Sequence, residues 1–188
     1  APQNFFGVDA VHVPIEIEDY WAGRGKSQQI DRLYAHLTRD SSVAEHARIE
    51  FDTNLEQAWQ SAFAGPYHLF FPGVAQTAFL LAVTGHYLFR LSGLNSFSIG
   101  VVINHRGHTG TQDLIGPVID VFPVRITVDP KDTHLSLFTR TSETLFEVLK
   151  YARCGVAPAQ DYDAVVNVLP ATVSRTTFAG LSCRMSWL

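Results

Sequence analysis

The stretch "LIGPVIDVFPVR", from Leu114 to Arg125, decides the fold of this chain. It is apolar and strand-like, yet Gly116-Pro117 stands near its start, Pro123 interrupts it and Asp120 lies in its middle. Each proline removes a backbone donor, so both prolines are expected at strand edges or junctions. The glycine lets the backbone pass closely where the strand begins. The segment therefore predicts a strand at an edge, with one acid that needs an explanation.

The elements around this stretch alternate between long helices and short strands. A proline at residue 72 suits a first helical turn, and Gly93 suits the position just after a helix end. In chain order we expect a helix over 72–91, strands over 97–104 and 118–128, a helix over 135–152, and strands over 162–170 and 178–188. Two long helices on a shared sheet predict a two-layer α/β sandwich. The sheet should be mixed, because no helix separates the last two strands.

The first part of the chain gives weaker patterns. Residues 11–21, "VHVPIEIEDYW", alternate weakly and contain a proline, which predicts an extended edge or loop. Apolar spacing predicts an amphipathic helix over 28–37 and a second helix over 52–63, and residues 47–51 are typical of a short strand. Thr53 and Glu56 fit a capping box at the start of the second helix.

Composition excludes several classes of function. The chain has 188 residues, a hydrophobic fraction of 46 % and a net charge of −4, which suit one domain or one lobe of a larger body. The mild negative charge argues against a nucleic-acid partner. The apolar run Val74–Leu91 carries Gln76, Thr77 and Arg90, so we expect a buried helix and no membrane partner. The chain shows no signal peptide, and we expect a cytoplasmic protein.

Few residues point to chemistry by themselves. The chain has no G-x-S-x-G elbow, no G-x-G-x-x-G and no P-loop. Cys154 and Cys183 are expected to be inert buried thiols. His105 and His108 form H-x-x-H, but no third ligand is placed beside them, so we expect a solvated loop and no metal.

Other polar residues have a structural and a functional interpretation. His86, on the apolar helix, is expected to be a hydrogen-bonded core histidine. The acids Glu16, Glu18 and Asp19 are expected to form a solvated acidic turn rather than an acid–base pair. Asn167 lies in the apolar strand "AVVNVLP", where an amide either ties strand ends together or donates into a cleft.

The segment Ile99–Arg125 resembles a stretch of nonribosomal peptide synthetase condensation domains, which carry an IGxxxxNR-like strand end followed by LIGxFVNxLxLR or GPxxNxxPxR. The residues that match the first half are Ile99, Gly100, Asn104 and Arg106, with His105 inserted before the arginine. Those that match the second half are Leu114, Ile115, Gly116, Pro117, Pro123 and Arg125. Asp120 stands where the family usually has asparagine. Two further segments, Val13–Gly25 and Tyr162–Pro170, resemble family segments in the same order.

The resemblance implies a chloramphenicol-acetyltransferase-like fold, in which two lobes form a V with a tunnel between them. Residues 1–45 would be a lead-in from the preceding lobe, and residues 46–188 would be a C-terminal lobe that is possibly incomplete at its end. The implied reaction is amide formation between acyl and aminoacyl thioesters. These substrates are carried on the 4'-phosphopantetheine arms of peptidyl or acyl carrier domains, and no cofactor is bound.

The resemblance also implies where the chemistry lies. The family's catalytic HHxxxDG motif belongs to the N-terminal lobe, and this chain contains no His-His pair. We therefore expect no catalytic residue here, an inactive isolated chain, and an N-terminal condensation lobe as partner. Asn167 is the candidate for a polar or oxyanion role in the tunnel. Asp120 and Arg106 are candidates for the tunnel floor, although Asp120 could instead pair with Arg106 or Arg125.

Two alternatives stay open. The chain could belong to an acyltransferase of the same fold that uses coenzyme A thioesters, or it could be a non-catalytic lobe that docks a carrier domain. In each case a lone lobe would expose an apolar face, and such faces usually mark association sites.

Overall fold

The computed structural model describes residues 15–22, 49, 52–69, 71–105, 118–157, 162–169, 176–178 and 181–183. In the last two ranges the backbone alone is described. The helices are α1 (Ile15–Ala22), α3 (Thr53–Ala64), α4 (Pro72–Ser92) and α5 (His134–Tyr151). The strands are β1 (Ser96–Asn104), β2 (Ile119–Thr127), β3 (Ala164–Val166), β4 (Thr176–Phe178) and β5 (Leu181–Cys183).

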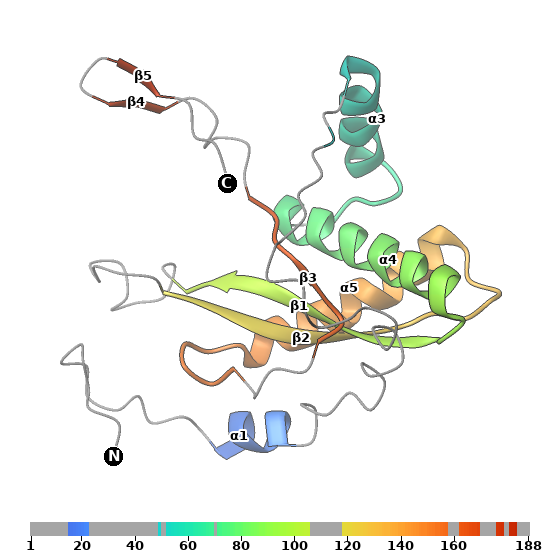
Figure 1. The fold of residues 1–188 in the computed structure, drawn as a ribbon, viewed down its shortest axis with the longest axis vertical. Coiled ribbons are helices and arrows are strands. Elements are labelled where there is room, and N and C mark those ends of the chain that lie inside the picture. Colours follow the sequence, from blue (N-terminus) through green and yellow to red (C-terminus); the bar gives the residue numbers. More distant parts are fainter. Residues whose placement is uncertain are drawn as a thin grey trace, which may run out of the picture.

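The main sheet has three strands in the order β2-β1-β3 (Figure 1). Strand β1 is antiparallel to β2 and parallel to β3, so the predicted mixed sheet is confirmed. Pro123 lies on β2, an edge of this sheet, and is paired with Gly100 of β1. The edge position explains how the sheet accepts a residue without a backbone donor.

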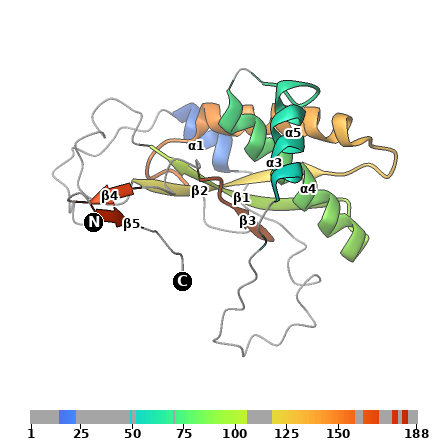
Figure 2. The same cartoon turned by 90° about the horizontal axis from the view of Figure 1, so that it is seen from above.

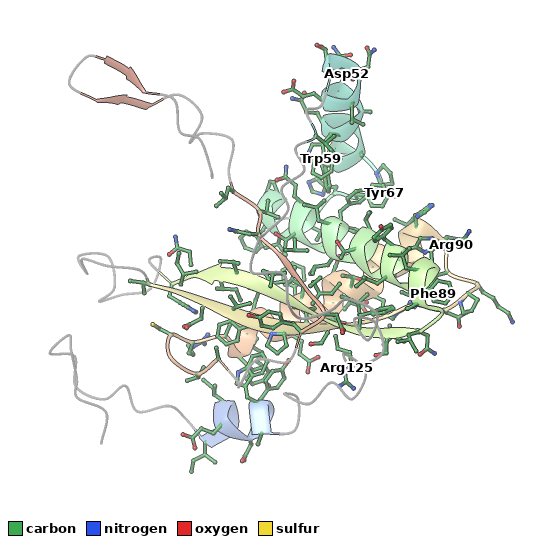
Figure 3. All side chains as sticks on the ribbon, viewed as in Figure 1. Asp52, Trp59, Tyr67, Phe89, Arg90 and Arg125 are labelled. Atoms are coloured by element: carbon green, nitrogen blue, oxygen red, sulfur yellow. The ribbon has the colours of Figure 1, made fainter. Side chains whose placement is uncertain are left out.

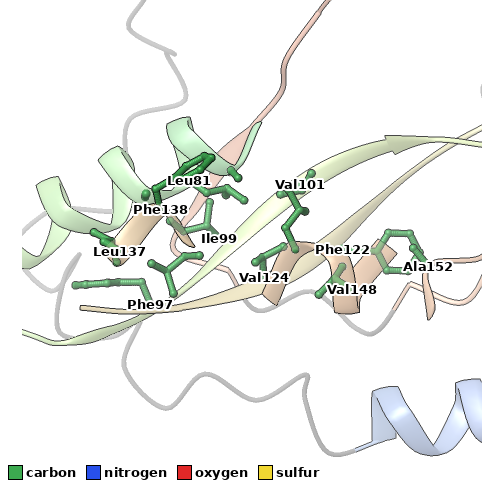
Figure 4. Packing of buried hydrophobic residues seen from close by; sticks show 14 of the residues in the cluster. Leu81, Phe97, Ile99, Val101, Phe122, Val124, Leu137, Phe138, Val148 and Ala152 are labelled. Carbon is green, nitrogen blue, oxygen red and sulfur yellow. The ribbon is translucent and has the colours of Figure 1, made fainter. Parts of the chain in front are cut away.

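Helices α4 and α5 contact each other and together cover one face of the sheet, which gives the expected two layers (Figures 1 and 2). Alternate residues of the strands point into this layer. Figure 4 shows the packing, in which Ile99 and Val101 of β1 and Phe122 and Val124 of β2 are buried against the helices. At Gly85 a Cβ would lie 2.6 Å from Cγ2 of Ile126, so the missing side chain lets α4 approach β2 closely.

The ends of the helices follow local sequence signals. Pro72 begins α4, and Gly93 ends it with a φ of 71° and an N–H that donates to the Phe89 carbonyl. Both expectations for this helix are confirmed, and among the described residues no helix is long and apolar enough to cross a membrane. The capping box predicted at Thr53 is wrong, because Asp52 is the N-cap and its carboxylate accepts from the Leu55 amide at 2.8 Å.

Two elements differ from the sequence prediction. Residues 15–22 form helix α1 and not an extended segment, because Ile17 and Trp21 lie one turn apart and are both buried. Trp21 packs on Phe122, and its indole N–H donates to the Tyr151 carbonyl at 3.2 Å. The fourth strand expected over 178–188 is instead the hairpin β4–β5, which forms a separate two-stranded sheet.

Other expectations for the fold lie outside the described residues. These are the helix over 28–37 and most of the strand over 47–51. The strand expected over 162–170 is confirmed over a shorter range, as β3. The division at residue 45 stays a prediction.

An ion pair fixes the connection between β2 and α5. Arg140 of α5 contacts the Asp132 carboxylate, which also accepts from the Asp129 amide at 2.8 Å and the Ser136 hydroxyl at 3.0 Å. The Arg140 guanidinium also donates to the Thr127 carbonyl at the end of β2. The hydrogen bond from Arg140 lowers the pKa of Asp132 to about 2.

Asp132→Asn is expected to lower the free energy of unfolding by about 1 kcal/mol at pH 7, since the pair is partly screened by solvent. Because the folded pKa lies below the ordinary value of 3.8, the stabilisation is present above pH 4 and is lost as the pH falls toward 2. Urea denaturation at pH 7, 5 and 3 measures the difference. Asp19→Asn, an exposed change on α1, is the control, and a difference that stays constant down to pH 3 contradicts the assignment.

Candidate functional site

A cavity of about 790 Å³ lies at the carboxyl end of β1. The first turns of α4, the end of β1, the last turns of α5 and the segment after β3 all contribute to its wall. The lining residues are Phe71, Pro72, Gly73, Val74, Gln76, Thr77, Val101, Val102, Ile103, Asn104, Leu145, Leu149 and Val168. Most of the wall is apolar, and the polar side chains come from α4 and the end of β1.

The sheet topology explains why the cavity forms here. Strands β1 and β3 are parallel, with Val101 paired to Val166, so their carboxyl ends reach the same edge of the sheet. This edge is where open α/β sheets usually hold ligands. Asn104 ends β1, and Val168 follows β3 by two residues. A volume in this range, lined mainly by apolar side chains with a few polar groups, is typical of a small-molecule site.

Asn167 lies at this edge, next to the lining residue Val168. Its side chain is exposed, so it is not an amide buried in a strand. It follows β3 directly and is not itself a lining residue. The arrangement brings Asn167 near the cavity, and its role as a donor stays a prediction.

Asp120 does not line the cavity; its partly exposed carboxylate contacts the buried His105. Its Oδ2 lies 3.3 Å from Nε2 of His105 and accepts from the Gly155 amide at 2.9 Å. The register pairs Asp120 with Ile103, which places it across from the end of β1. The contact joins the ends of β1 and β2 to the turn after α5.

His105 is fully buried, so the solvated loop predicted for it is wrong. Its backbone N–H donates to the Val118 carbonyl at 3.0 Å, which continues the β1–β2 pairing, and its ring lies 5.9 Å from that of Phe122. Arg106 and His108 lie outside the described residues. Arg125 is exposed and lines a different cavity of about 370 Å³, with Tyr20, Ser98 and Glu147 among its walls.

The remaining candidates are spread over the molecule. Cys154 is exposed rather than buried, and partial desolvation, with the nearby Asp120 charge, raises the pKa of its thiol. A raised pKa disfavours the thiolate, so the prediction of an unreactive thiol agrees with its surroundings. The side chain of Cys183 is outside the described part. Glu16, Glu18 and Asp19 are exposed as expected, although they lie on helix α1 and not in a turn.

Sequence patterns missed the polar side chains contributed by α4. Gln76 and Thr77 lie in its first turns and line the cavity, and the Thr77 hydroxyl donates to the Gly73 carbonyl at 2.8 Å. The available signal was two adjacent polar residues in a long apolar helix. In the described part of the chain, no three His, Cys, Asp or Glu side chains are close enough to hold a metal.

Comparisons with known proteins place this fold in a family. The sequence model of a family described as "Condensation domain" matches residues 16–161. The search among curated proteins found no match. Twenty-seven solved chains match the structure.

Three of the solved structures illustrate the similarity. The first condensation domain of the CDA synthetase has a TM-score of 0.62 at 16 % identity, with 89 % of this chain and 37 % of that chain covered. A variant of the starter condensation domain of rhizomide synthetase, in complex with C8-CoA, has a TM-score of 0.57 at 19 % identity, with 89 % and 39 % covered. The condensation domain from Monacolin K polyketide synthase has a TM-score of 0.54 at 17 % identity, with 77 % and 34 % covered. The chain thus spans well under half the length of these solved chains.

Proposed function

Because this chain belongs to the condensation-domain family and has its chloramphenicol-acetyltransferase-like fold, we propose that it forms one wall of an acyl-transfer tunnel. The reaction is amide formation between two thioester-bound substrates, delivered on phosphopantetheine arms by carrier domains. The observation that carries the proposal is the cavity of about 790 Å³ at the shared carboxyl ends of β1 and β3.

The reaction needs a base that these residues do not supply. The acceptor amine attacks the donor carbonyl, a C–N bond forms, the C–S bond breaks and the thiol leaves. The amine proton passes to a base, and the sequence has no His-His pair to match the family's HHxxxDG motif. We assign the base to an N-terminal condensation lobe. Asn167 supplies a donor at the edge of the cavity for the developing oxyanion.

An apolar sheet face supports the requirement for a second lobe. On the face turned away from α4 and α5, Ile119 and Val165 have exposed fractions of 54 % and 50 %. Val102 and Val121 lie beside them and are half-buried. Exposed apolar groups that lie together on one face usually mark an interaction surface. Among the described side chains, these four apolar residues offer a contact to a covering lobe.

The test is an amide-formation assay on the full-length protein with acyl and aminoacyl thioesters loaded on carrier domains. We expect product, detected by mass spectrometry, only when both substrates are carrier-bound. Turnover of free acyl-CoA with an unattached amine would instead identify a coenzyme A acyltransferase. Carrier binding without turnover, in protein that includes the HHxxxDG motif, would identify a docking lobe.

A further inference from the structure

A second cavity, of about 440 Å³, lies between α3, α4 and α5. It shares no lining residue with the cavity at the end of β1. Its walls come from the end of α3, the middle and last turns of α4 and the start of α5. Figure 3 shows Tyr67, which follows α3, and Arg90, near the end of α4. The acyl-transfer proposal leaves this cavity without a role.

The inner wall of the cavity is aromatic. The Tyr67 ring lies 5.1 Å from Phe79 and 5.0 Å from Phe138, and both contacts are edge-to-face. Val83 and Tyr87 continue the α4 wall in steps of one turn, with exposed fractions of 47 % and 60 %. The cavity is therefore open to solvent along α4. Aromatic rings placed in this way offer favourable edge and face contacts to another ring.

Besides the tyrosine hydroxyls, the polar groups of the lining are two histidines and an arginine. His86 and Arg90 lie one turn apart on α4, and His134 begins α5 with its ring centroid 5.8 Å from that of His86. All three can donate hydrogen bonds, and Arg90 carries a permanent positive charge. No Asp or Glu lines this cavity in the described part of the chain. The expectation that His86 is a core histidine is not met, since it is half-buried in this wall.

We propose that this cavity binds an aromatic monocarboxylate. The aryl group packs against the wall formed by Tyr67, Phe79 and Phe138, and the carboxylate reaches the donors at the opening. Arginine offers a planar fork that matches a carboxylate, and a charged hydrogen bond is about twice as strong as a neutral one. The volume lies in the range of small-molecule pockets. The inference does not depend on the proposed acyl transfer.

The probe is 2-naphthoate, titrated into the full-length protein and followed by its fluorescence. We expect a dissociation constant of about 100 µM, in line with the efficiency of small ligands. The neutral analogue 2-naphthalenemethanol should bind about tenfold more weakly, because it lacks the charge. Arg90→Gln should weaken the binding of 2-naphthoate by about tenfold and leave the affinity for 2-naphthalenemethanol unchanged. Lys131→Gln removes an equal charge at an exposed turn and is the matched control.

A second variant tests whether the ligands bind in this cavity. Val83→Trp adds bulk at the exposed wall and should reduce the binding of both ligands by at least about tenfold, with an unchanged melting temperature. The amide-formation assay, run on the same variants, should show parent activity, so failure of the two proposals can be told apart. Equal 2-naphthoate affinity in the parent and Arg90→Gln proteins would overturn the inference, as would the absence of saturable binding.

Discussion

Phe122→Ala is expected to lower the free energy of unfolding by about 3–5 kcal/mol. Phe122 is fully buried in β2. Its ring lies 5.2 Å from Trp21 of α1 and 5.9 Å from His105. The truncation removes apolar contacts and leaves a cavity where the helix layer, α1 and the buried histidine meet. Neighbours from three separate elements cannot all move to fill it.

Urea denaturation of the parent and variant proteins measures this loss. Phe146→Ala on α5 is the matched control, because the side chain is 39 % exposed and its removal should cost about 1 kcal/mol or less. If both alanine variants lost the same stability, Phe122 would not hold the position in the core that we describe.

Asn167→Ala is expected to lower the turnover of carrier-bound substrates by about 10²–10³, the usual cost of losing one oxyanion donor. The effect should fall on kcat more than on KM, since the charge develops in the transition state. The side chain is exposed, so the melting temperature should stay within the error of the measurement.

Asn54→Ala provides the control for the same chemical change. Asn54 is exposed on α3, away from the cavity at the end of β1, and its loss should leave kcat unchanged. Full turnover in Asn167→Ala would remove this residue from the oxyanion role. The family assignment, which rests on the sequence match, would still stand.

Local signals predicted the elements that carry the fold. Pro72 marks the start of α4 because its ring fixes φ, and Gly93 marks the end because glycine can adopt the left-handed φ of 71° found there. The sheet is mixed as predicted but for another reason, because β1 is antiparallel to β2 and parallel to β3, while β4 and β5 form a separate hairpin. Helix α1 was missed because "IEIE" alternates apolar and charged residues, which is the pattern of a strand. The buried pair Ile17 and Trp21 has helical spacing, but it spans one turn only.

The site was less accessible to sequence analysis, since it depends on contacts between distant segments. The sequence analysis placed Asn167 inside a strand over 162–170, whereas β3 ends at Val166 and Asn167 follows it at the sheet edge. The burial of His105 could not, because it requires Asp120 to be paired with Ile103 in the register of β1 and β2. Nothing local distinguishes such a histidine from one in an open loop.

Strand β3 joins the sheet through three residue pairs, whereas β1 and β2 share a register of nine residues each. Two hydrogen bonds between Asp163 and Ser98, at 2.7 and 2.9 Å, add to its attachment. Closing this contact also requires a long chain segment to return to β1. Amide protons of β3 should therefore exchange with solvent through a local opening, before those of β1 and β2. In the two-lobe assembly proposed above, a second lobe packed on β3 would hold the segment bearing Asn167 in place, which would couple assembly to activity.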